Sequence, residues 1–194
     1  MRVVGGEKRG FHLAVPSGRD LRPTSSRVRE ALYDILANRV RDARFLDLFA
    51  GSGAVGIEAL SRGARYCRFI EVDRRAARLI RRNLEACGLE GRADIRIAEL
   101  PEGLSRASVG KPFDIVFADP PYDRPAGDRL LASPTLASLL KPESLLILEH
   151  RKSWGPAPRI GSLLRQRSIR YGDTVLSFFV LAPATSPSDG LKRV

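Results

Sequence analysis

The segment FADPPYD, residues 117–123, places an acid, two prolines and a tyrosine directly after an apolar run. Consecutive prolines fix φ and remove two backbone donors, so they cannot donate to a sheet ladder, while their carbonyl groups stay rigidly oriented. The Asp119 carboxylate, the Pro120 carbonyl and the Tyr122 ring can therefore face one small volume. Such a volume suits an exocyclic nucleobase amine, because two acceptors on its N–H bonds direct its delocalised lone pair while the ring stacks on the base. Asp119 can also take the departing proton.

The segment DLFAGSGAVG, residues 47–56, forms a turn between an apolar run and a helical pattern. Its glycines satisfy the G-x-G-x-x-G pattern, and Glu71 lies 20 residues after Gly51, which is the spacing of a dinucleotide-binding turn. A nicotinamide dehydrogenase and a tightly packed turn without a ligand are two interpretations. Asp47 favours a third, because a carboxylate at this point repels a pyrophosphate but attracts the ammonium group of S-adenosylmethionine, whose ribose Glu71 would bind.

Apolar runs alternate with helical patterns from residue 44 onward, as is typical of a parallel α/β sheet covered on both faces. The sequence QRSIRY-GD-TVLSFFVLA (166–182) predicts an antiparallel hairpin with a two-residue turn. The prediction is a doubly wound, mostly parallel, seven-stranded Rossmann-like sheet with an antiparallel C-terminal hairpin. Both candidate segments follow strands and should lie at the edge where open α/β sheets bind ligands. We expect strands at 44–49, 66–72, 93–98, 113–119 and 144–150, and helices at 54–62, 74–87, 99–107 and 126–140.

The chain before residue 44 predicts a small appendage. RVV, GGEKRG and FHLAV (2–15) indicate a hairpin, and LRPTSSRVREALYDILANRV (21–40) indicates a helix capped by Thr24, Ser25 or Ser26. We expect three parts: an N-terminal hairpin appendage over 1–22, a methyltransferase domain over 23–183 and a flexible tail over 184–194, whose composition is typical of disorder.

The chain is strongly basic, with 33 Lys and Arg against 22 acids in 194 residues and a formal net charge of +11. Residues 62–82 hold eight arginines, and residues 150–170 hold six Lys and Arg without an acid. A polyanionic partner is expected, because the planar guanidinium group of arginine binds phosphate through paired donors. No apolar run is long enough for a membrane span, the first residues, MRVVGGEKRG, lack the apolar region expected of a secretory signal, and the two cysteines lack metal-ligand spacing. We expect a cytoplasmic protein without a metal or a membrane partner.

Taken in order, RVVGG…RG, LRPTSSRVREALYDIL, LDLFAGSGAVGIEALSRGA, IEVDR and FADPPY resemble the bacterial 16S ribosomal RNA guanine-N2 methyltransferases of RsmD type. The resemblance covers residues 1–183 and implies the class I S-adenosylmethionine-dependent fold. It also implies that Asp119, Pro120, Pro121 and Tyr122 hold the target amine and that the RPT…RVRE segment contacts the methionine end of the cofactor. The expected cofactor-binding residues are Asp47, Phe49, Ala50, Gly51, Ser52, Gly53, Glu71, Val72, Glu99, Thr24 and Arg27.

Glu99 is expected to contact the adenine amine, although the sequence around it, IAELPEG (97–103), departs from the usual sequence of class I enzymes after the third strand. The expected partner is ribosomal RNA or a small-subunit assembly particle, bound by a monomer. The expected RNA contacts are Lys8, Arg9, Arg22, Arg151 and Lys152.

Three alternatives differ from this expectation. The DPPY motif also serves DNA adenine-N6 and cytosine-N4 methyltransferases, but 194 residues leave no room for a separate target-recognition domain. A nicotinamide dehydrogenase has no evident use for DPPY, and a non-catalytic RNA-binding module would not need to keep it intact. The resemblance therefore implies methyl transfer from S-adenosylmethionine to guanine N2 of 16S ribosomal RNA.

Overall fold

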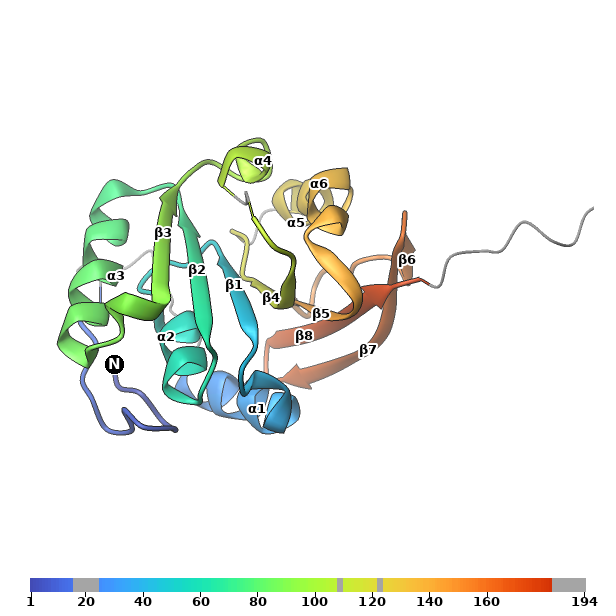
Figure 1. Cartoon of the computed structure of the whole chain (residues 1–194). Helices are drawn as coiled ribbons and strands as arrows, with labels where there is room; N and C mark the ends of the chain where they lie inside the picture. The colour runs from blue at the N-terminus through green and yellow to red at the C-terminus, as the bar shows by residue number, and fades with distance from the viewer. Residues whose placement is uncertain (16–24, 108–109, 122–123, 183–194) are drawn as a thin grey trace, which may run out of the picture.

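The computed structural model describes residues 1–15, 25–107, 110–121 and 124–182, and its centre is an eight-stranded sheet (Figure 1). The strand order is β3-β2-β1-β4-β5-β8-β7-β6. β1 to β5 run parallel, whereas β8 is antiparallel to β5 and β7 is antiparallel to β8, which confirms the predicted sheet and its C-terminal hairpin. The strands are β1 (Arg44–Leu48), β2 (Tyr66–Glu71), β3 (Ala93–Ile97), β4 (Phe113–Ala118), β5 (Leu140–Arg151), β6 (Arg159–Ile160), β7 (Leu163–Tyr171) and β8 (Thr174–Leu181).

The sheet has one strand more than the seven predicted. The additional strand, β6, consists of two residues that pair antiparallel with the start of β7. Two residues are too few to show the alternation of apolar and polar side chains that marks a strand in a sequence, so this strand left no signal.

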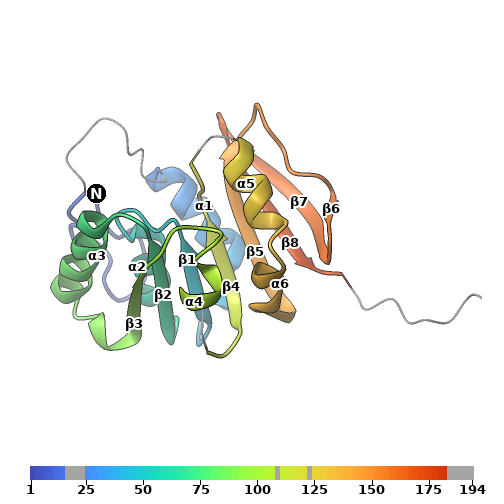
Figure 2. The same ribbon diagram turned by 90° about the horizontal axis from the view of Figure 1, so that it is seen from above.

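Helices cover both faces of the sheet, which confirms the doubly wound arrangement (Figure 2). Side chains alternate along β1: Phe45 belongs to the core beneath α1, α2 and α3, whereas Leu46 and Leu48 belong to the core beneath α4, α5 and α6. The helices are α1 (Ser26–Leu36), α2 (Ala54–Ser61), α3 (Arg74–Cys87), α4 (Leu104–Ala107), α5 (Arg124–Leu131) and α6 (Pro134–Ser138), with the 3-10 turns η1 (Ala37–Val40) and η2 (Glu90–Arg92).

The helix ends follow local sequence signals. Ser25 caps α1 by accepting a hydrogen bond from the Val28 N–H at 3.2 Å. Asp73 caps α3 by accepting from two N–H groups of its first turn, and Gly88 ends this helix in the left-handed conformation with a φ of 62°. The single helix predicted over 126–140 is instead divided into α5 and α6, because Pro134 begins a new helix.

Residues 1–15 form a narrow loop with one antiparallel bridge, between Arg2 and His12, in place of the two predicted strands. The loop is nevertheless part of the molecule's core, since Val3 and Leu13 are buried together with side chains of α1, α2 and α3. The remainder of the predicted appendage, 16–22, and the predicted tail over 184–194 lie outside the described residues.

Both cysteines are buried and unbonded to one another, as expected for core residues. In the described ranges, no helix combines the length and the apolar character that a membrane span requires.

Candidate active site

The turn between β1 and α2 adopts the left-handed conformation at Phe49 (φ 60°), Gly51 (φ 55°) and Gly53 (φ 75°). A Cβ on Gly51 would meet nothing closer than the Phe49 carbonyl oxygen at 4.0 Å, so Gly51 borders open space. Gly53 lies against α3, and a Cβ on Gly56 would collide with Phe69 of β2. Gly51 therefore lets a ligand approach the backbone, while the other two glycines permit close packing.

Asp47 lies on β1 beneath this turn and is 2% exposed. Its Oδ2 accepts a hydrogen bond from the Gly56 N–H at 2.9 Å. Burial raises the pKa of Asp47 to about 8; the hydrogen bond from Gly56 opposes this shift, and the negative charge of Glu71 adds to it. A nearby cation would favour the ionised form, whereas a bound phosphate would not.

Glu71 connects the end of β2 to the glycine turn. Its carboxylate accepts from the Gly51 N–H at 2.8 Å and from the Asp73 N–H at 2.9 Å. These two backbone bonds fix the orientation of the side chain. A carboxylate offers about four acceptor sites, so capacity for ribose hydroxyl groups remains.

Asp119 follows β4 at the same edge of the sheet. Ala118, the last residue of β4, pairs with Leu48 at the end of β1 and with Leu148 of β5, so Asp119 follows a strand that lies between these two. The pKa of Asp119 is raised well above its usual range, mainly by burial and further by the negative charges of Glu149 and Asp47. Asp47 and Asp119, the acids of the two candidate segments, therefore lie close enough to interact electrostatically, at the sheet edge where both segments were predicted.

Glu149 is a site residue that the sequence analysis missed. It lies on β5, is 2% exposed and contributes to the raised pKa of Asp119. The available signal is its position at the end of the apolar run SLLIL, since an acid in a buried strand is rare unless it is paired or functional.

The other expected cofactor residues are spread over the same edge and beyond it. Val72 and Glu99 are exposed just after β2 and β3, and Arg27 is exposed in the first turn of α1. Among the residues of the described ranges, no three His, Cys, Asp or Glu side chains cluster as metal ligands. Ala50, Ser52 and Pro120 are buried, Pro121 is exposed, and Tyr122, Thr24 and Arg22 lie outside the described residues.

The expected RNA contacts occupy two separate places. Lys8 and Arg9 lie in the turn of the N-terminal loop, and Arg9 is exposed. Arg151 and Lys152 lie at the end of β5, where Lys152 Nζ is 2.6 Å from Asp173 Oδ1. This ion pair offsets part of the positive charge at the end of β5.

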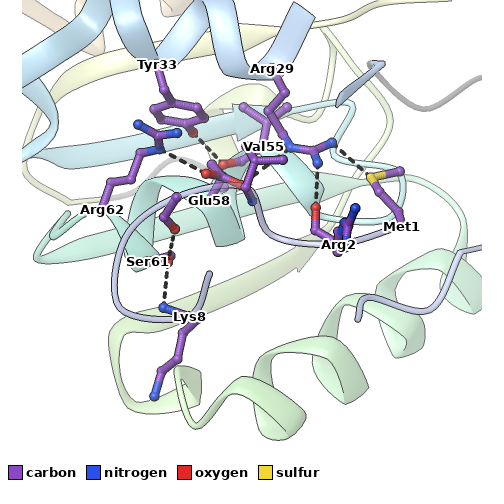
Figure 3. A network of polar contacts seen from close by, with 12 residues as sticks. Met1, Arg2, Lys8, Arg29, Tyr33, Val55, Glu58, Ser61 and Arg62 are labelled. Carbon is purple, nitrogen blue, oxygen red and sulfur yellow. Dashed lines mark hydrogen bonds and ion pairs between the residues drawn. The ribbon is translucent and has the colours of Figure 1, made fainter. Parts of the chain in front are cut away.

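A buried polar network fixes the N-terminal loop to α1 and α2, and sequence reasoning did not find it (Figure 3). The side chains of Arg29 and Glu58 are fully buried, with 3.6 Å between Arg29 Nε and Glu58 Oε2. Arg29 donates to the Arg2 carbonyl at 2.7 Å, and Glu58 accepts from the Val4 N–H at 2.9 Å. The loop is thus hydrogen-bonded to the helix that follows the glycine turn.

Asn83 of α3 links the N-terminal loop directly to the glycine turn. Its side-chain amide donates to the Ala14 carbonyl at 3.0 Å and to the Ser52 carbonyl at 3.1 Å. Its Oδ1 accepts from the Ala14 N–H at 2.9 Å. One buried side chain therefore positions both segments, although a lone asparagine in a helical pattern gives no sign of this role.

Comparisons with known proteins point to one group. The model of the family described as Conserved hypothetical protein 95 matches residues 1–180. "Ribosomal RNA small subunit methyltransferase D" of Escherichia coli K12 is 45% identical over 124 residues, which are 64% of this chain and 61% of that protein. The Haemophilus influenzae protein of the same name is 34% identical over 154 residues, covering 78% of this chain and 79% of that protein. A solved hypothetical protein from Thermus thermophilus is 35% identical, with a TM-score of 0.75, and the match covers 92% of this chain and 98% of that chain.

Proposed function

The chain belongs to the family of Conserved hypothetical protein 95, the RsmD-type methyltransferases, and from this premise we propose that it methylates the exocyclic N2 amine of a guanine in small-subunit ribosomal RNA. We propose S-adenosylmethionine as the methyl donor. The relatives' names support ribosomal RNA as the substrate class, and the residues at the carboxyl edge of the sheet support an amine as the acceptor.

The observation that carries this proposal is the buried Asp47 carboxyl beneath the glycine turn. S-adenosylmethionine fits this site in charge, because its ammonium and sulfonium groups are positive and it has no phosphate to be repelled. When bound, it supplies a methyl group on a positively charged sulfur. Asp47 would hold the ammonium, Glu71 would accept from the ribose hydroxyls, and the open side of Gly51 would admit the ligand to the backbone.

Asp119 and the carbonyl of Pro120 supply the acceptors for the target amine. Each would accept one N–H of the amine, so that the nitrogen lone pair is directed away from the base plane. The raised pKa of Asp119 also suits a proton acceptor, because an acid that holds its proton well above the usual carboxyl range is a stronger base when ionised. We keep Tyr122 as the proposed stacking partner of the base and Pro121 as its support.

The net charge of +11 supports a polyanionic substrate. Lys8, Arg9, Arg22, Arg151 and Lys152 remain the proposed RNA contacts of the sequence analysis. Bases of RNA are accessible mainly in single-stranded loops and bulges, where an unpaired guanine can enter a pocket.

Two measurements test the proposal. Calorimetry should show binding of S-adenosylmethionine, and tight binding of NADH with no response to S-adenosylmethionine would contradict the cofactor assignment. Methylated nucleosides should then be mapped in ribosomal RNA from cells with and without the protein. Loss of one N2-methylguanosine of the small-subunit RNA is expected; an unchanged RNA together with methylation of duplex DNA at adenine N6 or cytosine N4 would favour the DNA alternative.

A further inference from the structure

We propose that the outer face of α3 is a docking surface for the phosphate backbone of the RNA substrate, an inference that rests on the proposed function for the identity of that RNA. We name this surface the α3 arginine face. It consists of Arg74, Arg75, Arg78, Arg81 and Arg82.

The five arginines form one continuous stripe. All five are exposed, whereas Ala76, Ala77, Ile80 and Leu84 of the same helix are buried against the sheet. At 3.6 residues per turn the five positions fall on one side of the helix, and the stripe is about 12 Å long at 1.5 Å per residue. A strand of nucleic acid laid along the helix would therefore meet several guanidinium groups at once.

The fold gives these arginines no structural task. None of the five has a side-chain hydrogen bond or an ion pair with another described residue. Other arginines do: Arg68 pairs with Asp94 at 2.9 Å, and Arg62 pairs with Glu58 at 2.9 Å. The absence of carboxylate partners within the described ranges leaves the positive charge of the stripe available to an external anion.

The distribution of charge along α3 even opposes helix stability. Arg74 and Arg75 lie in the first turn, where the macrodipole favours acids, and Glu85 lies near the C-terminus, where it favours bases. Arg74 and Arg78, and Arg78 and Arg82, are like-charge pairs four residues apart, which are destabilising. Local rules broken at this many positions of one element are typical of a functional surface.

Helix α3 begins at the active-site edge of the sheet and runs toward the N-terminal loop (Figure 1). At its start, Asp73 caps α3 and donates its N–H to Glu71 of the proposed cofactor site. Beyond its end, Arg92 forms an ion pair with Glu7, which directly precedes Lys8 and Arg9 in the N-terminal loop. RNA bound along α3 would thus extend between the active-site edge and these two basic residues.

A nucleic acid fits this surface better than a protein does. Protein interfaces usually have an apolar centre, whereas protein–nucleic acid interfaces are polar and positively charged. The exposed large apolar side chains of the described ranges are Phe11, Val15, Val72, Ile97 and Leu164, and none of these five lies on α3.

The test compares two variants with the same change of charge. R75Q/R78Q/R82Q removes three charges from the α3 arginine face, and R39Q/R41Q/R65Q removes three exposed arginines that border a hollow at the opposite, amino-terminal edge of the sheet. Binding of protein-free small-subunit RNA and of immature small-subunit particles is measured over a salt series, beside S-adenosylmethionine affinity and thermal melting. At ~100 mM salt the α3 variant should bind RNA at least about tenfold more weakly than the unaltered protein. The slope of the logarithm of the binding constant against the logarithm of the salt concentration should be smaller in magnitude by about two to three, because each lost phosphate contact lowers it by roughly 0.7–0.9.

The control should bind RNA as the unaltered protein does, and both variants should keep their cofactor affinity. The α3 variant should melt at the same temperature or higher, because glutamine removes the repulsion between arginines. If both variants bind RNA equally weakly, the effect is due to net charge alone and the proposal is wrong. Unchanged RNA binding by the α3 variant would also contradict it. A defect confined to particles and absent with protein-free RNA would overturn it too, and would indicate a protein partner instead. RNA binding that depends on the α3 arginine face without any methyl transfer would contradict the proposed function and leave this surface standing.

Discussion

Three carboxyl groups, on Asp47, Asp119 and Glu149, meet where β1, β4 and β5 end. Burial raises the pKa values of both Asp47 and Asp119, with a further contribution from Glu71 at Asp47 and from Glu149 and Asp47 at Asp119. These acids therefore retain protons that surface carboxyls lose near pH 4. The protonation state of the site therefore depends on what binds beside it. A cation favours ionisation of the cluster, whereas a phosphate opposes it.

Cofactor binding should release a proton from Asp47 near pH 7. The pKa of about 8 means that Asp47 is mostly protonated at pH 7 in the free protein, and a bound ammonium lowers that pKa. The affinity for S-adenosylmethionine should therefore rise with pH, by at most about tenfold per unit, and level off above pH 8. Calorimetry in buffers of different ionisation enthalpy measures the released proton directly.

Asp47→Asn should abolish this proton release and weaken binding. Asp73→Asn is the matched control, because it makes the same acid-to-amide change at the cap of α3 and retains a side-chain oxygen acceptor. A binding enthalpy that does not depend on the buffer in the unaltered protein would exclude Asp47 as the partner of the ammonium.

Replacement of Asp119 should separate binding from chemistry. Asp119→Ala should keep its cofactor affinity and lose roughly 10²–10³ in turnover, the scale for one preorganised group that acts in the transition state. Asp119→Asn retains an acceptor oxygen and should lose less, unless the carboxylate itself removes the proton. Single-turnover methyl transfer is the measurement, and a near-normal rate for Asp119→Ala would exclude the proposed role.

Glu149→Gln tests the electrostatic origin of the Asp119 pKa. Removal of the Glu149 charge leaves burial as the main cause of the shift, so the pKa of Asp119 should fall while staying above its usual range. If ionised Asp119 is required, the acidic limb of the pH–rate profile moves to lower pH. An acidic limb that stays in place would show that Asp119 does not titrate in the rate-limiting step.

The sequence could predict those site residues that belong to a spaced motif. The positions of Asp47 and Asp119 at one edge of the sheet could be predicted because a glycine turn and a proline pair mark the ends of their strands; their roles stay predictions. Glu149 and Asn83 were not found, because a single polar residue within an apolar or helical pattern has no spacing to recognise. Their roles arise from contacts between distant segments; the hydrogen bond of Asn83 to Ala14, for example, joins residues 69 apart in the chain.

At the scale of elements, α3 has two different sides with two different tasks. Its inner side carries Asn83, which holds the glycine turn through the Ser52 carbonyl and the N-terminal loop through Ala14. Its outer side is the α3 arginine face. The geometry of the cofactor turn and the proposed docking surface for RNA therefore depend on the same helix.

Asn83→Ala should weaken both stability and cofactor binding. The substitution leaves the buried Ser52 carbonyl without its partner, and one such unsatisfied group costs about 1–3 kcal/mol. Chemical denaturation should show a loss of this order in the free energy of unfolding, and calorimetry should show weaker binding of S-adenosylmethionine. Glu85→Ala, an exposed change on the same helix, is the control and should lower neither quantity. Cofactor affinity that survives Asn83→Ala would show that the glycine turn keeps its shape without this bond.

Elements with strong local signals were predicted well, and those made by tertiary contacts were not. The strands β1 to β5, the C-terminal hairpin and the cap of α1 by Ser25 were confirmed. The two-residue β6 was not predicted, and the predicted N-terminal hairpin is only a single bridge between Arg2 and His12. In both cases the pairing depends on neighbouring segments. Within α1, the burial of Arg29 was unexpected, because an arginine in a helical pattern predicts an exposed position.

At the scale of the whole molecule, the acidic active-site edge belongs to a chain with a net charge of +11. The carboxyl groups of the active-site edge would repel phosphates, whereas the α3 arginine face and the end of β5 near Arg151 would attract them. This distribution favours a bound RNA whose backbone lies on the basic surface while a base, which has no negative charge, reaches the acidic active-site edge. The positive net charge and the acidic site are therefore compatible with one substrate.

The N-terminal loop belongs to the stability of the whole molecule as well as to its surface, and removal of residues 1–13 should show this. Val3 and Leu13 are buried in the main core, and burial of such a side chain contributes about 1.5–3 kcal/mol. Truncation also removes the Arg2 carbonyl and the Val4 N–H from buried Arg29 and Glu58. The truncated chain should therefore lose roughly 3–6 kcal/mol of the roughly 5–15 kcal/mol typical of a domain and melt at a much lower temperature.

The full-length variant K8Q/R9Q separates the surface role of the loop from its role in the core. The fold uses the backbone N–H of Lys8, which donates to Ser61 Oγ at 2.9 Å, and this bond survives the change of side chain. K8Q/R9Q should therefore melt like the unaltered protein and bind small-subunit RNA more weakly, with a salt slope reduced by about one to two. If the truncated chain melts at the normal temperature, the loop is not needed for the stability of the molecule. If K8Q/R9Q binds RNA normally, Lys8 and Arg9 are not RNA contacts.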